Sequence, residues 1–142
     1  MNPNFQEVFT KNKEIKLDGK KTVSIDLFYR TSDDNNNVEG LVLNIHYEPS
    51  KLTILNITDN SPSMLSCNTI KNIINDPNDE NYKIVKIAWG DIFAKWPGKK
   101  LPINIASLTF NVETLSESII KFTEQECAPR YRFKQNNLKL IK

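Results

Sequence analysis

The sequence is short of the residues on which most active sites depend. It has one histidine and four glycines in 142 residues. It contains no G-x-S-x-G, H-E-x-x-H or glycine-rich phosphate-binding motif. Its acidic pairs lie in polar stretches, where solvated carboxylates are the ordinary case. We therefore expect no catalytic centre, and we expect His46 to be a structural residue within a strand.

Long apolar runs and targeting signals are also missing. No stretch approaches the ~18 to 20 apolar residues that a membrane-spanning helix needs. Residues 1–7 have neither a basic segment nor an apolar core, so no secretory signal peptide is predicted from the sequence as written. We expect the chain to stay in its cell of synthesis, or to leave it by a route other than a signal peptide.

Cysteine and net charge are both low. Cys67 and Cys127 are too few for a disulfide scaffold and too far apart for a C-x-x-C motif, so two free thiols or a single bridge remain open. Nineteen basic and seventeen acidic residues give a net charge of +2, which does not indicate a nucleic-acid-binding protein. The length is that of one domain, residues 1–142.

What the sequence does contain is repeated alternation of apolar and polar residues. In residues 22–30, one face carries Val23, Ile25, Leu27 and Tyr29. This period of two predicts a strand with one buried face. Further strands are predicted at residues 14–17, 41–47, 52–57, 83–89, 103–112, 119–122, 130–133 and 138–141. Seven to nine short strands without a long amphipathic helix predict an all-β, antiparallel sandwich.

Two segments depart from simple alternation. In residues 103–112 the apolar face shifts by one residue near Ile105 and Ala106, and a β-bulge there would restore the register. Ile70, Ile73 and Ile74 have the i, i+3, i+4 spacing of a helix, which predicts one helical turn inside the long connection at residues 59–81.

Three segments resemble a known family. Residues 41–52, LVLNIHYEPSKL, resemble the cohesin segment in which an apolar strand is followed by Tyr-Asp-Pro-Ser-x-Leu, with Glu48 in place of the usual Asp. Residues 86–89, KIAW, and 105–112, IASLTFNV, are similar to two later cohesin strands, in the same order. Residues 88–102 are similar to a variant in cohesin-like domains of marine bacterial and cyanobacterial surface proteins. The resemblance covers most of residues 23–112.

The resemblance implies a jelly-roll β-sandwich of about nine strands, related to carbohydrate-binding modules, and a role in calcium-assisted docking or adhesion. We predict a non-catalytic structural or adhesion protein that docks onto a large assembly. The first assembly considered is a virion, with the chain as a capsid or tail decoration protein on the virion exterior. The alternative is an extracellular or cell-surface docking module with a dockerin-like partner, or a carbohydrate-binding module. Neither nucleic-acid binding nor membrane insertion is expected.

No cofactor is required by this role, and calcium is the one candidate. Hard oxygen ligands are clustered at Asp33, Asp34, Asn35, Asn36 and Asn37, which lie between two predicted strands. A mobile polar turn is the alternative for this segment. A weaker second group is formed by Asp76, Asn78, Asp79 and Glu80.

The loop at residues 90–102 is the candidate partner-binding segment. It combines large apolar groups with a basic rim at Phe93, Lys95, Trp96, Lys99 and Lys100. Such a mixture is typical of a protein–protein contact. The alternative is that Trp89 and Trp96 hold the loop onto the core, because tryptophan is usually largely buried.

Overall fold

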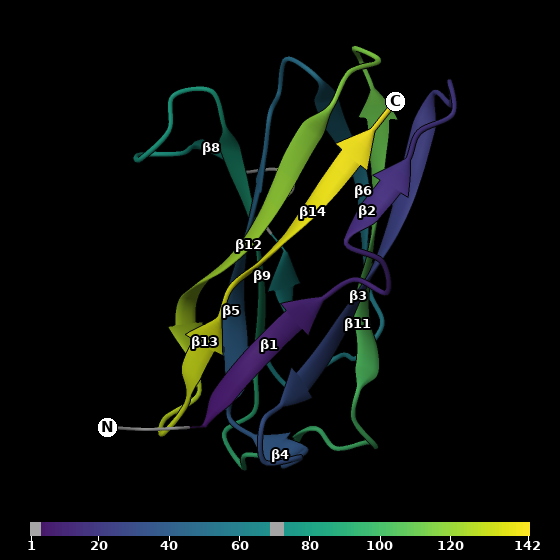
Figure 1. The fold of residues 1–142 in the computed structure, drawn as a ribbon. Coiled ribbons are helices and arrows are strands. Elements are labelled where there is room, and N and C mark those ends of the chain that lie inside the picture. Colours follow the sequence, from purple (N-terminus) through teal and green to yellow (C-terminus); the bar gives the residue numbers. More distant parts are fainter. Residues whose placement is uncertain (1–3, 69–72) are drawn as a thin grey trace.

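The computed structural model describes residues 4–68 and 73–142, which fold into two main β-sheets packed against each other (Figure 1). In spatial order, the first sheet contains β13 (Arg132–Lys134), β1 (Phe5–Phe9), β3 (Thr22–Thr31), β11 (Ile103–Val112) and β6 (Leu52–Asp59). The second contains β2 (Glu14–Lys16), β14 (Asn136–Ile141), β12 (Ser118–Cys127), β5 (Gly40–Tyr47), β9 (Lys83–Gly90) and β7 (Cys67–Asn68), with β8 (Ile74–Asn75) also on β9. A small ribbon joins β4 (Asn37–Val38) to β10 (Trp96–Pro97). The predicted all-β sandwich is confirmed.

The core lies between the two sheets and is built by the alternation seen in the sequence. On β3 the predicted apolar face is buried, while Ser24 and Asp26 are exposed. The facing strands contribute in the same way, with Leu43, Ile45, Val85, Ile87 and Phe122 at or close to zero exposure. Burial of alternate residues from both sheets stabilises the fold by removing apolar surface from water.

The predicted bulge in β11 is confirmed. Its pairing with β3 shifts register between Asn104 and Ala106. As a result both Ile105 and Ala106 are fully buried, although they are adjacent in sequence. The extra residue lets both parts of β11 direct their apolar side chains into the core.

Within this mainly antiparallel sandwich, two strand pairs are parallel. β1 runs parallel to β13, and β14 runs parallel to β2. The described residues form fourteen strands instead of about nine. The number is higher because six of the strands are only two or three residues long.

β1 was not predicted, because its residues do not alternate. Gln6, the second residue of the strand, is fully buried. The Gln6 amide donates to the Tyr29 hydroxyl at 2.7 Å and to the Gly40 carbonyl at 2.9 Å, and it accepts from the Ala128 N–H at 2.8 Å. These bonds satisfy a polar side chain inside the core, so the strand tolerates it.

The predicted helical turn is wrong for the residues described. Ile74 belongs to β8 and pairs with Ile84 of β9, so sheet pairing prevails over the helical spacing. Ile70 lies outside the described residues. The strand predicted at 130–133 begins only at Arg132, because Arg130 has a φ of 70° within a turn. No helix in the described part of the chain could span a membrane.

Candidate docking site at one end of the sandwich

The loop after β9 is a tight turn that holds two apolar side chains in solvent. The Ala94 N–H donates to the Asp91 carbonyl at 3.0 Å, and the Phe93 N–H donates to Asp91 Oδ1 at 2.8 Å. An Asp that binds the backbone two residues on is a common device for fixing a turn. The central residues point outward: Ile92 is 72% exposed and Phe93 is 65% exposed.

A second loop meets the first at Gly90. The Leu65 N–H donates to the Gly90 carbonyl at 2.9 Å, and the Gly90 N–H donates to Ser63 Oγ at 3.0 Å. Met64 and Leu65 are 54% and 62% exposed. Among the described residues eight large apolar side chains are exposed, and four of them lie in these two loops. We call Met64, Leu65, Ile92 and Phe93 the apolar tip.

Trp96 lies beneath the tip and is buried, at 2% exposure. Its ring stacks on Trp89 at 5.3 Å and packs against Tyr29 at 4.8 Å. Its Nε1 donates to the Ser61 carbonyl at 2.8 Å, which ties the loop at residues 61–66 to the core. From the sequence, Trp96 could either contact a partner or hold the loop onto the core. Its burial shows that it holds the loop onto the core. This corrects its place among the predicted partner-binding residues.

Phe93, Lys95, Lys99 and Lys100 are exposed around this end of the molecule, as their predicted role requires. The Gly98 N–H donates to the Asn36 carbonyl at 2.8 Å, and Asn36 Nδ2 donates to the Lys99 carbonyl at 3.0 Å. With the pairing of β4 and β10, these bonds place the lysine loop beside the polar loop at residues 33–37, near the bottom of Figure 1. The structure therefore brings the two predicted sites together, and their binding roles stay predictions.

The oxygens of the polar loop already accept hydrogen bonds. The Tyr131 hydroxyl donates to Asp33 at 2.8 Å, Asn35 Oδ1 accepts the Asn37 N–H, and Asn36 Oδ1 accepts the Asn37 amide. Burial opposes ionisation of Asp33, but the Tyr131 hydroxyl and the Asn35 N–H outweigh it and lower the Asp33 pKa. Among the described residues no group of three His, Cys, Asp or Glu side chains could hold a metal. A calcium ion would have to displace these donors, so we expect a weak site.

Calcium binding at this loop can be tested by thermal unfolding. If Asp33, Asp34, Asn35 and Asn37 are ligands, millimolar calcium raises the melting temperature, because a ligand that binds only the folded state stabilises it. Asp33→Ala combined with Asp34→Ala should abolish the increase. An increase that survives both substitutions would place the ion elsewhere, and no increase in the unaltered protein would remove calcium from the account.

The second acidic group has a structural partner. Asp76 is buried, and its Oδ2 lies 2.7 Å from His46 Nδ1, while His46 Nε2 lies 2.7 Å from Thr123 Oγ1. The Asp76 N–H donates to the Tyr82 carbonyl at 3.0 Å. The network thus fastens the segment at residues 76–82 onto β5 and β12. The structural role in a strand predicted for His46 is confirmed, whereas its partners Asp76 and Thr123 were not predicted.

Asp79 also contributes to this fastening, since its carboxylate lies 4.0 Å from Lys121 Nζ. Asp79 Oδ1 accepts the Asn81 N–H at 3.0 Å, and the Asn78 N–H donates to Asp76 Oδ1 at 2.9 Å. Glu80 is exposed in the same turn. These contacts explain the acidic group as a folded turn docked on the second sheet.

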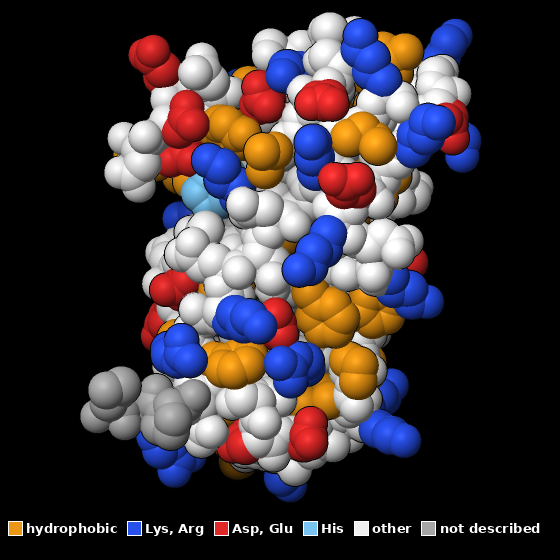
Figure 2. Space-filling model, in the orientation of Figure 1, with side chains coloured by type: hydrophobic (Ala, Val, Ile, Leu, Met, Phe, Trp, Pro, Cys, Tyr) orange, Lys and Arg blue, Asp and Glu red, His pale blue; other side chains and the backbone are white. Residues whose placement is uncertain are grey.

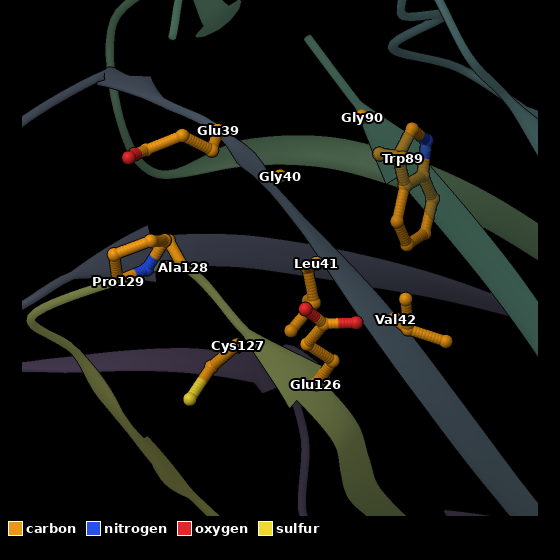
Figure 3. A pocket seen from close by; sticks show the side chains of 10 residues that line it. All are labelled: Glu39, Gly40, Leu41, Val42, Trp89, Gly90, Glu126, Cys127, Ala128 and Pro129. Atoms are coloured by element: carbon orange, nitrogen blue, oxygen red, sulfur yellow. The ribbon is translucent and has the colours of Figure 1, made fainter. Parts of the chain in front are cut away.

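A hollow of about 210 Å³ lies where the ends of β5, β9 and β12 meet (Figure 3). Glu39, Glu126 and Cys127 are among its lining residues. Cys127 is a free thiol whose Sγ donates to the Tyr131 carbonyl at 3.0 Å, and burial raises the Cys127 pKa. A thiol held in its protonated form is a poor nucleophile. The side chain of Cys67 is not among those that the structure describes.

The outer face of the first sheet offers a less open surface. Its Phe5 ring has three cations near it, at 5.2 Å for Arg30, 5.5 Å for Arg132 and 5.4 Å for Lys134. Figure 2 shows one side of the molecule with Lys and Arg interspersed with Asp and Glu, and with apolar side chains in small groups among them. Because this ring is already covered by cations, we take the apolar tip as the stronger candidate site.

No protein-family model matches the chain, and no curated protein matches it. Solved structures do. CaCohA2 from Clostridium acetobutylicum has a TM-score of 0.59 at 14% identity, over 96% of this chain and 90% of that one. The sixth cohesin of Acetivibrio cellulolyticus scaffoldin B, solved with a Cel5 dockerin, has a TM-score of 0.59 at 10% identity, over 97% of each chain.

A type I cohesin–dockerin complex from Clostridium thermocellum also matches, with a TM-score of 0.59 at 10% identity, over 96% of this chain and 99% of that one. Identities this low carry the fold and no more. On this evidence the chain has the β-sandwich fold of these cohesin structures, and the predicted cohesin-like fold is confirmed.

Proposed function

We propose that this protein is a non-catalytic docking module that binds another protein through the apolar tip and its lysine rim. The observation that carries the proposal is the exposure of four large apolar side chains on two loops that the backbone and Trp96 hold in place. Exposed apolar groups rimmed by polar residues mark interaction sites. A preorganised surface also loses less conformational entropy on binding.

A dockerin-like protein is the partner that the comparisons favour. Of the three structures named above, two were solved with dockerins. Nothing in the comparisons supports the virion decoration role, so the alternative anticipated from the sequence becomes the main proposal. An extracellular or cell-surface scaffold is the setting that goes with it.

Catalysis and carbohydrate binding have less support. The row of Asp76, His46 and Thr123 has the order of a hydrolase triad, but its contacts fasten a turn to the sheet. A carbohydrate platform needs several exposed rings, whereas Phe93 is the one aromatic among the exposed large apolar side chains of the described residues. A single ring suits an anchor in a protein contact better.

The proposal is tested by titrating purified dockerin modules into the protein by calorimetry. Phe93→Ser should weaken binding by about 2 kcal/mol, roughly thirtyfold in Kd, as for the central residue of an interface. Leu115→Ser is the matched control, since Leu115 is 46% exposed in the loop after β11. If both variants bind as the unaltered protein does, the tip is not the docking site. If no dockerin binds, the dockerin-like partner is wrong.

A further inference from the structure

β6 forms the one long edge of the sandwich within residues 4–68 and 73–142. Its eight residues pair with β11 on one side, and no described strand pairs with the other side. The other strands at sheet edges, β13, β2, β7 and β8, are two or three residues long. A long edge strand presents unpaired backbone N–H and C=O groups to any further strand.

β6 also has few of the features that normally block such an edge. Natural edge strands are protected by lysine, proline, inward-pointing charges or β-bulges, and of these β6 has only a bulge, at Leu55. From Leu52 to Thr58 the strand has no charged residue and no proline, and Asp59 at its end is its only charge. Leu55 is 52% exposed in its centre.

The strand is symmetric about its centre because of a bulge. Asn56 pairs with Thr109 and Ile54 pairs with Phe110, so Leu55 is the extra residue. Ile54 and Ile57 are therefore both buried, at 7% and 8%, although they are three positions apart and would face opposite sides of a regular strand. Thr53 and Thr58 are both exposed. The pattern is Thr-Ile-x-x-Ile-Thr, which is the same from either end.

We infer that a second copy of this chain pairs with the free edge of β6 in antiparallel, twofold-symmetric register. Ile54 of one copy then lies opposite Ile57 of the other, and Thr53 lies opposite Thr58. Lys51 precedes the strand and Asp59 ends it, so antiparallel pairing brings opposite charges together at both ends. The same surface is used by both copies, as a twofold interface requires. The first sheet of one copy and the first sheet of the other then form one continuous sheet across the interface.

The dimer has a consequence for docking, and this consequence rests on the proposed function. The loop at residues 61–66 follows the C-terminal end of β6. Antiparallel pairing therefore sets the two apolar tips at opposite ends of the dimer. Such a dimer links two partner molecules and does not concentrate both on one side.

Sedimentation velocity over a concentration series tests the pairing. The unaltered protein is expected to shift from monomer to dimer, and Leu55→Lys with Thr58→Lys should raise the dimer dissociation constant at least about tenfold by placing like charges across the interface. Ile119→Lys is the control, because Ile119 is exposed at 39% on β12 of the other sheet. It should dimerise normally.

Two results would overturn the inference. One is a protein that stays monomeric up to about 1 mM, where any association would be weaker than roughly 4 kcal/mol. The other is a dimer that survives the lysine pair but is lost in Phe93→Ser, which would locate self-association at the tip. Dockerin binding is measured on the lysine-pair variant as well, and it should be unchanged. Failure of the dimer and failure of the docking proposal are thereby separated.

Discussion

Trp96→Ala is expected to lower the free energy of unfolding by about 4 kcal/mol, the usual cost of truncating a buried tryptophan. The ring is almost fully buried between Trp89 and Tyr29, and its Nε1 donates a hydrogen bond to the Ser61 carbonyl. Truncation leaves a cavity in the core and frees an acceptor. Urea unfolding followed by circular dichroism measures the change.

Phe93→Ala is the matched control, since it also truncates an aromatic side chain in the same loop. Its ring is 65% exposed, so its loss should change the unfolding free energy by less than about 0.5 kcal/mol. Equal stability losses in the two variants would contradict the division of the loop into a buried brace and an exposed contact.

His46→Ala is expected to destabilise the protein by about 3 kcal/mol, because it leaves the Asp76 carboxylate buried without its imidazole partner. The double variant with Asp76→Ala should lose less than the sum of the two single variants, since each removes the same contact. Strict additivity would show that the two side chains do not stabilise one another.

The same pair predicts a pH dependence. Burial opposes ionisation of Asp76, but the Asn78 N–H and His46 outweigh it and lower the Asp76 pKa. A carboxyl with a lower pKa in the folded state stabilises the fold above its unfolded pKa, about 4, and loses that contribution as pH falls through the folded pKa. Asp76→Asn should therefore flatten the fall in stability below about pH 4. An unaltered acid limb would show that Asp76 contributes nothing there.

Alternation predicted the strands whose two faces have different environments. β3, β5, β9 and β11 each have one buried face and one less buried face over most of their length, so period two is visible in their residues. β1 was missed because a glutamine in the core is allowed by the hydrogen bonds that Gln6 donates to Tyr29 and Gly40 and accepts from Ala128. No local pattern encodes partners that far along the chain. The parallel pairing of β1 with β13 depends in the same way on long-range topology.

The sequence predicted one of the two loops that form the candidate site. Phe93 and the three lysines stand out in one loop, but the burial of Trp96 depends on Trp89 and Tyr29 from other strands. Met64 and Leu65 were not identified, because the loop that carries them is held by hydrogen bonds of Leu65 and Ser63 to Gly90, far along the sequence. They lie within the polar stretch at residues 59–81, which shows no apolar alternation around them.

The central claim, that the apolar tip is the docking surface, is tested most directly by amide hydrogen exchange on the complex with a bound dockerin. The account predicts slower exchange on binding at residues 61–66 and 91–95, with the centres of β5, β9 and β12 unchanged. Protection confined to those central strands, with the two loops exchanging as in the free protein, would contradict it.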